Sequence, residues 1–177
     1  MQWGGRTIIL YHFDPSETLN RTWTEFGDGF YNDVWATWIG LEKLYWLSHS
    51  RIFDLHIEFK KTTNPDTYVK IVYENFEIGD SSTNYQLLSA QLNRARSPVN
   101  ITDCLSDLIG SSFSSYDMDN NQVPGLDCPL TYGGAWWYNG ACAKCNPLGD
   151  LHGNHDAAIF WEPLPWRPEG ISIWFQN

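Results

Sequence analysis

Acidic and amide side chains crowd one short segment that could bind a hard cation. Asp117, Asp119 and Asn121 offer oxygen donors at alternate positions, and Ca²⁺ takes such oxygens as ligands. The segment is not an EF-hand loop, because Gln122 stands where that loop needs glycine and Cys128 where it needs a bidentate glutamate. The spacing by itself therefore fits either a calcium loop or a solvated acidic turn.

Four cysteines surround this segment, and an even number permits a disulfide framework. They are Cys104, Cys128, Cys142 and Cys145, and they allow three pairings. Two other chemistries are open. Cys142 and Cys145 form a C-x-x-C, as in redox motifs, although no βαβ pattern accompanies it. Together with His152 and His155, the same two cysteines could form a zinc set.

An aromatic turn, GGAWWYN, follows Cys128 and fits neither a regular helix nor a regular strand. Loops of this composition commonly carry binding residues. We expect Trp136 and Trp137 to pack in the core, because large aromatic side chains usually do. The aromatic residues expected to keep an exposed edge are Tyr132, Tyr138 and Trp166.

The composition narrows the class of partner. The 177 residues carry 11 Lys and Arg against 21 Asp and Glu, a net charge of -10, so we expect no binding to nucleic acid or to anionic membranes. No run approaches the roughly 18 apolar residues of a spanning helix, so we expect no membrane insertion. No nucleophile elbow, zincin, P-loop or dinucleotide fingerprint occurs, and we expect no enzyme activity.

Weaker signals indicate the compartment. Two sequons, at Asn20 and Asn100, permit N-glycans in a secreted chain. The first residues contain no basic leader followed by an apolar stretch. With the even cysteine count, these features favour a secreted, extracellular domain expressed without its leader.

Two short helices are expected in the first third of the chain. Asn20 or Thr22 could cap a brief helix that Gly27 and Gly29 would end. A second helix is expected over Trp38–Leu47, where apolar residues recur at helical spacing.

Strands follow these helices. Phe53–Lys60 and Tyr68–Glu74 alternate apolar and polar residues with period two. Asn64-Pro65-Asp66 between them is turn chemistry, so the pair predicts a hairpin. After a stretch rich in Gly, Pro, Asn, Asp and Ser, residues 157–161 and 171–175 return to β-type sequence.

A set of motifs in a fixed order resembles the fibrinogen C-terminal domain, which occurs in fibrinogen chains, ficolins, tachylectins, angiopoietins and invertebrate fibrinogen-related proteins. The motifs are Gly4-Gly5 with TIIL, NRTWTEFGDGF, WIGLEKLYWL, FDLHIEF, YDMDNN, GGAWWYNGAC, CNPLG and IFW. The resemblance covers nearly the whole chain. It implies an α+β fold with a mixed, mainly antiparallel sheet, short helices and a loop-rich calcium and ligand subdomain, and it implies that the family's N-terminal subdomain is missing.

We therefore expect a single fibrinogen-like domain over residues 1–177. Within it, residues of about 1–90 together with 157–177 would form the central sheet subdomain. Residues of about 91–156 would form the loop-rich binding subdomain.

The resemblance also implies which groups would hold calcium. They are the side chains of Asp119 and Asn121 and the backbone carbonyls of Val123 and Gly125. Asn121 stands where the family has an acid, and fewer formal charges weaken such sites. The loop therefore predicts a weak or empty Ca²⁺ site.

For the cysteines, the resemblance pairs Cys128 with Cys142 across the aromatic turn. A bridge between Cys104 and Cys145 is then the simplest hypothesis for the remaining pair. Each such bridge would stabilise the domain by about 2–4 kcal/mol.

The resemblance finally implies a ligand pocket beside the calcium loop, built around a cis peptide before the second cysteine. By position, its residues are Thr131, Tyr132, Ala141, Cys142, Ala143, His155 and Asp156. Asp156 is the residue most expected to bind ligand, because its carboxylate can accept hydrogen bonds from sugar hydroxyls. Ala143 stands where the family has His, and the Trp-x-x-Trp motif is stretched to Trp161–Trp166. These departures argue against an acetyl-recognising pocket of the ficolin type.

The resulting expectation is a secreted recognition module that binds glycans or other surface groups of microbes or parasites in innate immunity. The alternative is a protein-binding domain, such as a receptor ligand or a matrix or clot assembly module, without lectin activity. Its partners would be glycans or surface proteins of microbes, parasites or the host. Because single lectin sites bind weakly, we also expect homo-oligomers that form through segments outside this chain.

Overall fold

The computed structural model describes residues 2–3, 5–32, 36–121, 123–140, 142, 144–151 and 158–176. The strands are β1 (Gln2–Trp3), β2 (Arg6–His12), β3 (Phe30–Asn32), β4 (Ala36–Trp38), β5 (Asp54–Lys61), β6 (Asn64–Ile78), β7 (Leu87–Leu92), β8 (Cys145–Asn146), β9 (Phe160–Trp161) and β10 (Gly170–Gln176). The α-helices are α1 (Trp23–Asp28), α2 (Leu41–Ser50) and α3 (Cys128–Tyr132), and the 3₁₀ turns are η1 (Ser81–Thr83) and η2 (Ser106–Leu108).

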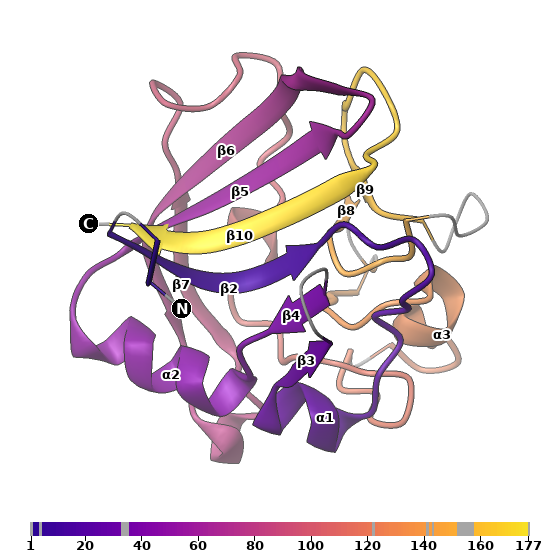
Figure 1. Cartoon of the computed structure of the whole chain (residues 1–177). Coiled ribbons are helices and arrows are strands. Elements are labelled where there is room, and N and C mark those ends of the chain that lie inside the picture. The colour runs from indigo at the N-terminus through magenta and orange to yellow at the C-terminus, as the bar shows by residue number, and fades with distance from the viewer. Residues whose placement is uncertain are drawn as a thin grey trace.

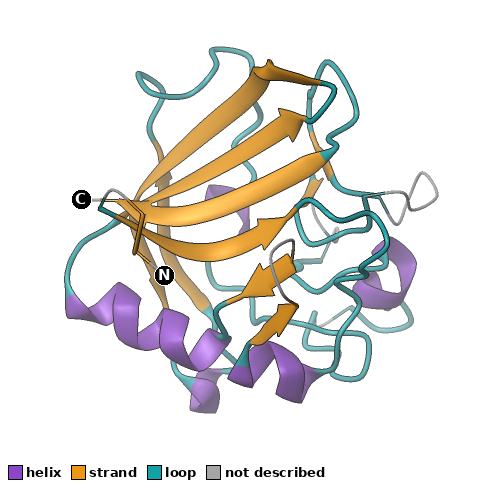
Figure 2. Ribbon diagram, viewed as in Figure 1, coloured by secondary structure: helices purple, strands orange, loops and turns teal. Residues whose placement is uncertain are grey.

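An antiparallel sheet runs through the centre of the molecule in the order β3-β4-β2-β10-β5-β6-β7, with β1 paired to β2. A separate two-stranded sheet joins β8 and β9. Figure 1 shows α1 and α2 along one side of the central sheet, and Figure 2 shows that loops dominate the region around α3. This mainly antiparallel arrangement with few short helices confirms the predicted α+β fold.

The buried sides of the strands explain the sheet. Leu55, Ile57 and Phe59 of β5 are at most 2% exposed, as the period-two pattern predicts. β10 lies between β2 and β5, and its residues 170–175 are all buried. A strand covered on both faces is mostly apolar rather than alternating, which accounts for the sequence ISIWF, in which Ser172 is the polar residue.

The turn of the β5–β6 hairpin lies earlier than predicted. β6 already begins at Asn64, and the turn residues are Thr62 and Thr63. The register shifts where β5 leaves Lys60 opposite Tyr68 and places Lys61 opposite Asn64. Such a shift marks a bulge or irregularity in the ladder.

Helix α1 starts and ends at identifiable signals. Thr22 caps α1 through a reciprocal capping box with Glu25, as one of the two expected caps. α1 continues through Gly27 and ends before Gly29, whose φ of +90° suits glycine, so only the second predicted stop operates. The second helix also starts later than predicted, because Trp38 belongs to β4 and α2 begins after Gly40 at φ +101°.

The aromatic turn packs inward more fully than expected. Trp136 and Trp137 are 2% and 1% exposed, which confirms their predicted core position. Tyr138 is also only 1% exposed, so the prediction of an exposed edge was wrong for this residue. Its hydroxyl donates to the backbone carbonyl of Gly134 over 2.7 Å, and this internal partner allows the phenol to be buried.

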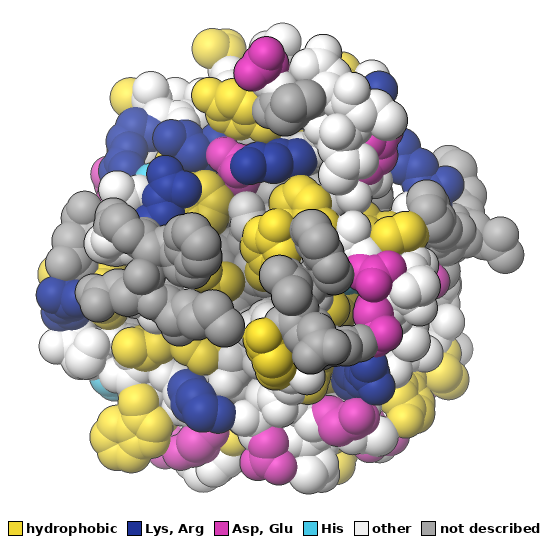
Figure 3. All heavy atoms as spheres, in the orientation of Figure 1, with side chains coloured by type: hydrophobic (Ala, Val, Ile, Leu, Met, Phe, Trp, Pro, Cys, Tyr) yellow, Lys and Arg dark blue, Asp and Glu magenta, His cyan; other side chains and the backbone are white. Residues whose placement is uncertain are grey.

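A cationic and aromatic stack crosses the sheet face shown in Figure 3, where Lys and Arg side chains gather over β5 and β6. The Arg6 guanidinium lies 4.6 Å from the centre of the Trp174 ring. The His56 ring also stacks on the Trp174 ring, with the two centroids 5.2 Å apart. Arg96 donates to His56 Nε2 over 3.2 Å and pairs with Asp54. Burial and the positive charge of Arg96 lower the pKa of His56 to about 4.

Candidate functional site

Two disulfides staple the loop-rich part of the chain. Cys128 is bonded to Cys142 and Cys104 to Cys145, with Cα–Cα distances of 5.5 and 6.2 Å. These are the two pairings expected from the sequence. They exclude the C-x-x-C redox motif, since its two cysteines have different partners. They also exclude the zinc set, because disulfide sulfurs are not thiolate ligands.

The short helix α3 carries one wall of a pocket. Asp127 caps α3 by accepting a hydrogen bond from the Leu130 N–H over 3.0 Å, and Gly133 ends it at φ +62°. At its last position, Tyr132 accepts a hydrogen bond from the Asn146 amide on its carbonyl over 2.7 Å. This bond fixes the backbone at the end of α3, from which the Tyr132 side chain projects.

Aromatic neighbours fix the ring of Tyr132. Its centroid lies 6.1 Å from that of Tyr138, nearly parallel to it, and 5.8 Å from that of Phe160. Burial, followed by the neighbouring Tyr132, raises the pKa of the Tyr138 hydroxyl well above its ordinary value. The hydroxyl therefore remains a neutral donor beneath the pocket at physiological pH.

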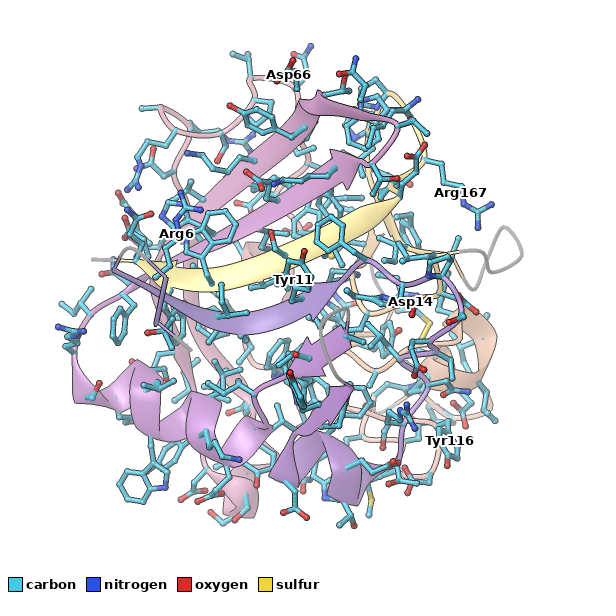
Figure 4. The ribbon with its side chains drawn as sticks, viewed as in Figure 1. Arg6, Tyr11, Asp14, Asp66, Tyr116 and Arg167 are labelled. Atoms are coloured by element: carbon cyan, nitrogen blue, oxygen red, sulfur yellow. A yellow bond between two sulfur atoms is a disulfide. The ribbon has the colours of Figure 1, made fainter. Side chains whose placement is uncertain are left out.

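The pocket itself has a volume of about 550 Å³ and lies between α3 and the segment that links β9 to β10. Its lining residues are Tyr132, Ala158, Ile159, Phe160, Trp161, Glu162, Pro163, Leu164, Trp166, Arg167 and Pro168. Ligand pockets of proteins have this size and this mixture of many apolar walls with few polar groups. Figure 4 shows that Arg167 projects outward from the protein body at this edge.

Long-range hydrogen bonds hold the Trp161 side of the pocket. The Trp161 indole donates to the carbonyl of Thr102 over 3.0 Å, and the Thr102 N–H donates to the carbonyl of Glu162 over 2.9 Å. The Lys61 ammonium approaches the Trp166 ring at 5.9 Å from its centroid. The wall is therefore tied both to the loop before η2 and to the end of β5.

The predicted pocket residues fall into three groups. Tyr132 lines the pocket, and its neighbour Thr131 is exposed with its hydroxyl turned back to the carbonyl of Asp127 over 2.7 Å. Cys142 is 2% exposed and has a φ of +60°. The other predicted residues, Ala141, Ala143, His155 and Asp156, lie outside the described residues, as does the cis peptide expected before Cys142.

The sequence reasoning missed the polar residues of the wall, Glu162 and Arg167. The stretched spacing of Trp161 and Trp166 is the signal in the sequence that points to them. Three prolines in and after this segment stiffen it, which suits it to form a pocket wall.

The acidic loop next to α3 is closed by its own hydrogen bonds. Asn121 is 4% exposed, and its amide nitrogen donates to the Leu126 carbonyl over 2.8 Å while its oxygen accepts from the Val123 N–H over 2.8 Å. The Val123 carbonyl accepts from the Leu126 N–H over 3.2 Å, and Asp119 accepts from the Asn121 N–H over 3.1 Å. Three of the four groups expected to ligate Ca²⁺ thus already have partners within the loop.

The two other acids of this region have structural partners as well. Asp117 accepts hydrogen bonds from the Trp23 N–H at the start of α1 over 2.8 Å and from the Ser115 hydroxyl over 2.7 Å. Asp127 caps α3. Within the described part of the chain, no three His, Cys, Asp or Glu side chains come together as a metal-binding group. The one carboxylate and one amide expected to hold Ca²⁺ already have partners within the loop, and they offer a cation little charge.

Two further features bear on the environment of the protein. Asn20 and Asn100, the sequon asparagines, are both exposed. None of the helices in the described residues is long and apolar enough to cross a membrane.

Comparison with known proteins gives relatives along the full length of the chain. A family model described as the C-terminal globular domain of fibrinogen beta and gamma chains matches residues 1–176. The chain is 29% identical over 173 residues to a tenascin of Gallus gallus, covering 97% of this chain and 9% of that protein. It is 30% identical over 166 residues to fibrinogen-like protein A of Apostichopus parvimensis, covering 92% of this chain and 56% of that protein. The chain thus spans less than two thirds of these relatives.

Solved structures show the same fold. The fibrinogen-like globe domain of human ANGPTL2 matches with a TM-score of 0.83 at 24% identity, covering 98% of this chain and 81% of that chain. A lamprey fibrin D-dimer, complexed with the peptide ligand Gly-His-Arg-Pro-amide, matches with a TM-score of 0.78 at 21% identity, covering 96% of this chain and 60% of that chain.

Proposed function

Because this chain belongs to the family of fibrinogen C-terminal globular domains, we propose that it is a secreted, non-catalytic recognition module. Its ligands are glycans or other surface groups of microbes or parasites, and its biological setting is innate immunity. Fibrinogen-like domains occur in diverse proteins, among them tenascins and angiopoietins, which fits a general binding role.

The pocket between α3 and the β9–β10 segment is the observation that supports this proposal. Tyr132, Phe160 and Trp166 supply aromatic faces, and rigid aromatic rings give large contact area at recognition sites. Glu162 and Arg167 add one acceptor group and one donor group at the same opening. Sugars present apolar ring faces and hydroxyls together, which is the combination that such a lining complements.

Removal of the Trp166 ring tests this assignment. Trp166→Ala should weaken binding to the glycans selected by a glycan array at least tenfold, which corresponds to about 1.4 kcal/mol. Trp46→Ala is the matched control, because Trp46 is 64% exposed on α2 and does not line the pocket. Isothermal titration should show full affinity for the control. Equal affinity in both variants would remove this pocket as the binding site.

The sequence-based candidate Asp156 gives a second test. Asp156→Ala should weaken binding of the same glycans if Asp156 also contacts the ligand, as the family resemblance implies. Unchanged affinity would confine the site to the described wall.

A protein ligand is the second candidate function. The lamprey fibrin neighbour is complexed with a peptide ligand, and Glu162 would complement a basic group on such a partner. A glycan array without signal, together with tight binding to one protein that Glu162→Gln weakens, would favour this alternative. In either case, we propose that oligomerisation through segments outside this chain raises the avidity.

A further inference from the structure

We infer that the Asn121 side-chain amide replaces the cation in closing the loop of residues 117–127, so that this side of the pocket is held in place without Ca²⁺. The inference starts from the direction of the amide. Its nitrogen faces the Leu126 carbonyl and its oxygen faces the Val123 N–H, each over 2.8 Å. In the reverse orientation the amide nitrogen would face the Val123 N–H and the amide oxygen would face the Leu126 carbonyl. Neither pair can form a hydrogen bond, so the partners determine the orientation of the amide.

The Asn121 side chain presents a donor to the Leu126 carbonyl, where a carboxylate would present only acceptors. A carboxylate at position 121 would present two oxygens, one of which would face the Leu126 carbonyl and repel it unless a cation lay between them. The amide N–H₂ instead binds that carbonyl directly. Because Asn121 is only 4% exposed, both of its hydrogen bonds are shielded from water, and leaving either group unpaired would be costly.

The cross-link reaches the pocket through α3. Leu126 precedes Asp127, whose carboxylate caps α3 and whose carbonyl accepts from the Thr131 N–H over 3.0 Å. α3 ends at Tyr132, which lines the pocket. Asn121 is thus a positioning residue for Tyr132. The closure of the loop does not depend on which ligand the pocket binds, so the calcium and glycan experiments can fail separately.

Calcium dependence of unfolding tests the inference. In scanning calorimetry the unfolding midpoint of the wild-type domain should be the same, within about 1 °C, in excess EDTA and in about 2 mM CaCl₂, a concentration at which extracellular modules bind. Asn121→Asp should unfold several degrees lower in EDTA, on the order of 4 °C. Calcium should then raise its midpoint, because a ligand that binds only the folded state stabilises it.

Asn75→Asp is the matched control, since it makes the same change at an exposed residue of β6, and it should acquire no calcium response. Titration of CaCl₂ into the wild-type domain needs no variant and should produce no binding heat. A calcium-dependent rise of several degrees in the wild-type midpoint would overturn the inference. So would an Asn121→Asp protein that folds normally in EDTA and ignores calcium.

Discussion

The two disulfides should stabilise the domain unequally, in the order of the loops that they close. Cys104 and Cys145 are 41 residues apart, and Cys128 and Cys142 are 14 apart. The loop-entropy relation gives about 4 kcal/mol for the first bridge and about 3 kcal/mol for the second. For a domain of this size, these values correspond to roughly 8–16 °C and 6–12 °C of unfolding midpoint.

Paired alanine variants allow a clean comparison. All four cysteines are at most 2% exposed, so Cys104→Ala with Cys145→Ala and Cys128→Ala with Cys142→Ala leave voids of similar kind. The packing costs should therefore largely cancel between the two variants. What remains is the difference in loop closure, with the longer loop costing about 1 kcal/mol more.

Equilibrium urea unfolding under non-reducing conditions measures both the cost and its origin. If the bridges act by restricting the unfolded chain, removing one exposes more surface on unfolding and raises the m-value. An inverted order, with the shorter loop costing more, would refute the loop-closure reasoning. Unchanged m-values would place the effect in native packing instead.

Two other residues give separable effects on stability. The pKa of His56 is lowered from 6.5 to about 4 in the folded protein. As the pH falls through this window, the unfolded chain binds a proton that the folded chain does not bind. The free energy of unfolding therefore drops by about 3 kcal/mol. In His56→Phe, urea unfolding from pH 7 to pH 4 should show a pH dependence smaller by that amount, and identical dependence in both proteins would contradict the prediction. Thr22→Ala removes the cap of α1 and should cost about 1 kcal/mol, whereas Thr22→Ser keeps the hydroxyl and the sequon of Asn20. Calorimetry of deglycosylated protein should show the loss in Thr22→Ala alone, and an equal loss in Thr22→Ser would point to packing of the methyl group rather than the cap.

Local patterns predicted the parts of the fold whose cause is local. The alternation in β5 placed Leu55, Ile57 and Phe59 inside because a strand turns successive side chains to opposite faces. The cap at Thr22 needs only Glu25, three residues on. The same alternation placed His56 on the outer face, where the structure buries it under the side chains of Arg96 and Trp174. That burial depends on residues 40 and 118 positions away, which no local pattern includes.

The pocket could be predicted only in part for the same reason. Tyr132 belongs to a cysteine-flanked motif whose position along the chain is regular, so resemblance located it. The opposite wall depends on the link from the Trp161 indole to Thr102, 59 residues earlier, and on a proline-rich stretch longer than the family pattern. Sequence comparison records such a stretch as a departure and assigns it no role. The fold gives this stretch a role, because it places Glu162 and Trp166 in the same pocket lining as Tyr132. Divergence of specificity in this family member is therefore expected in the wall after Trp161, while the scaffold around α3 stays recognisable.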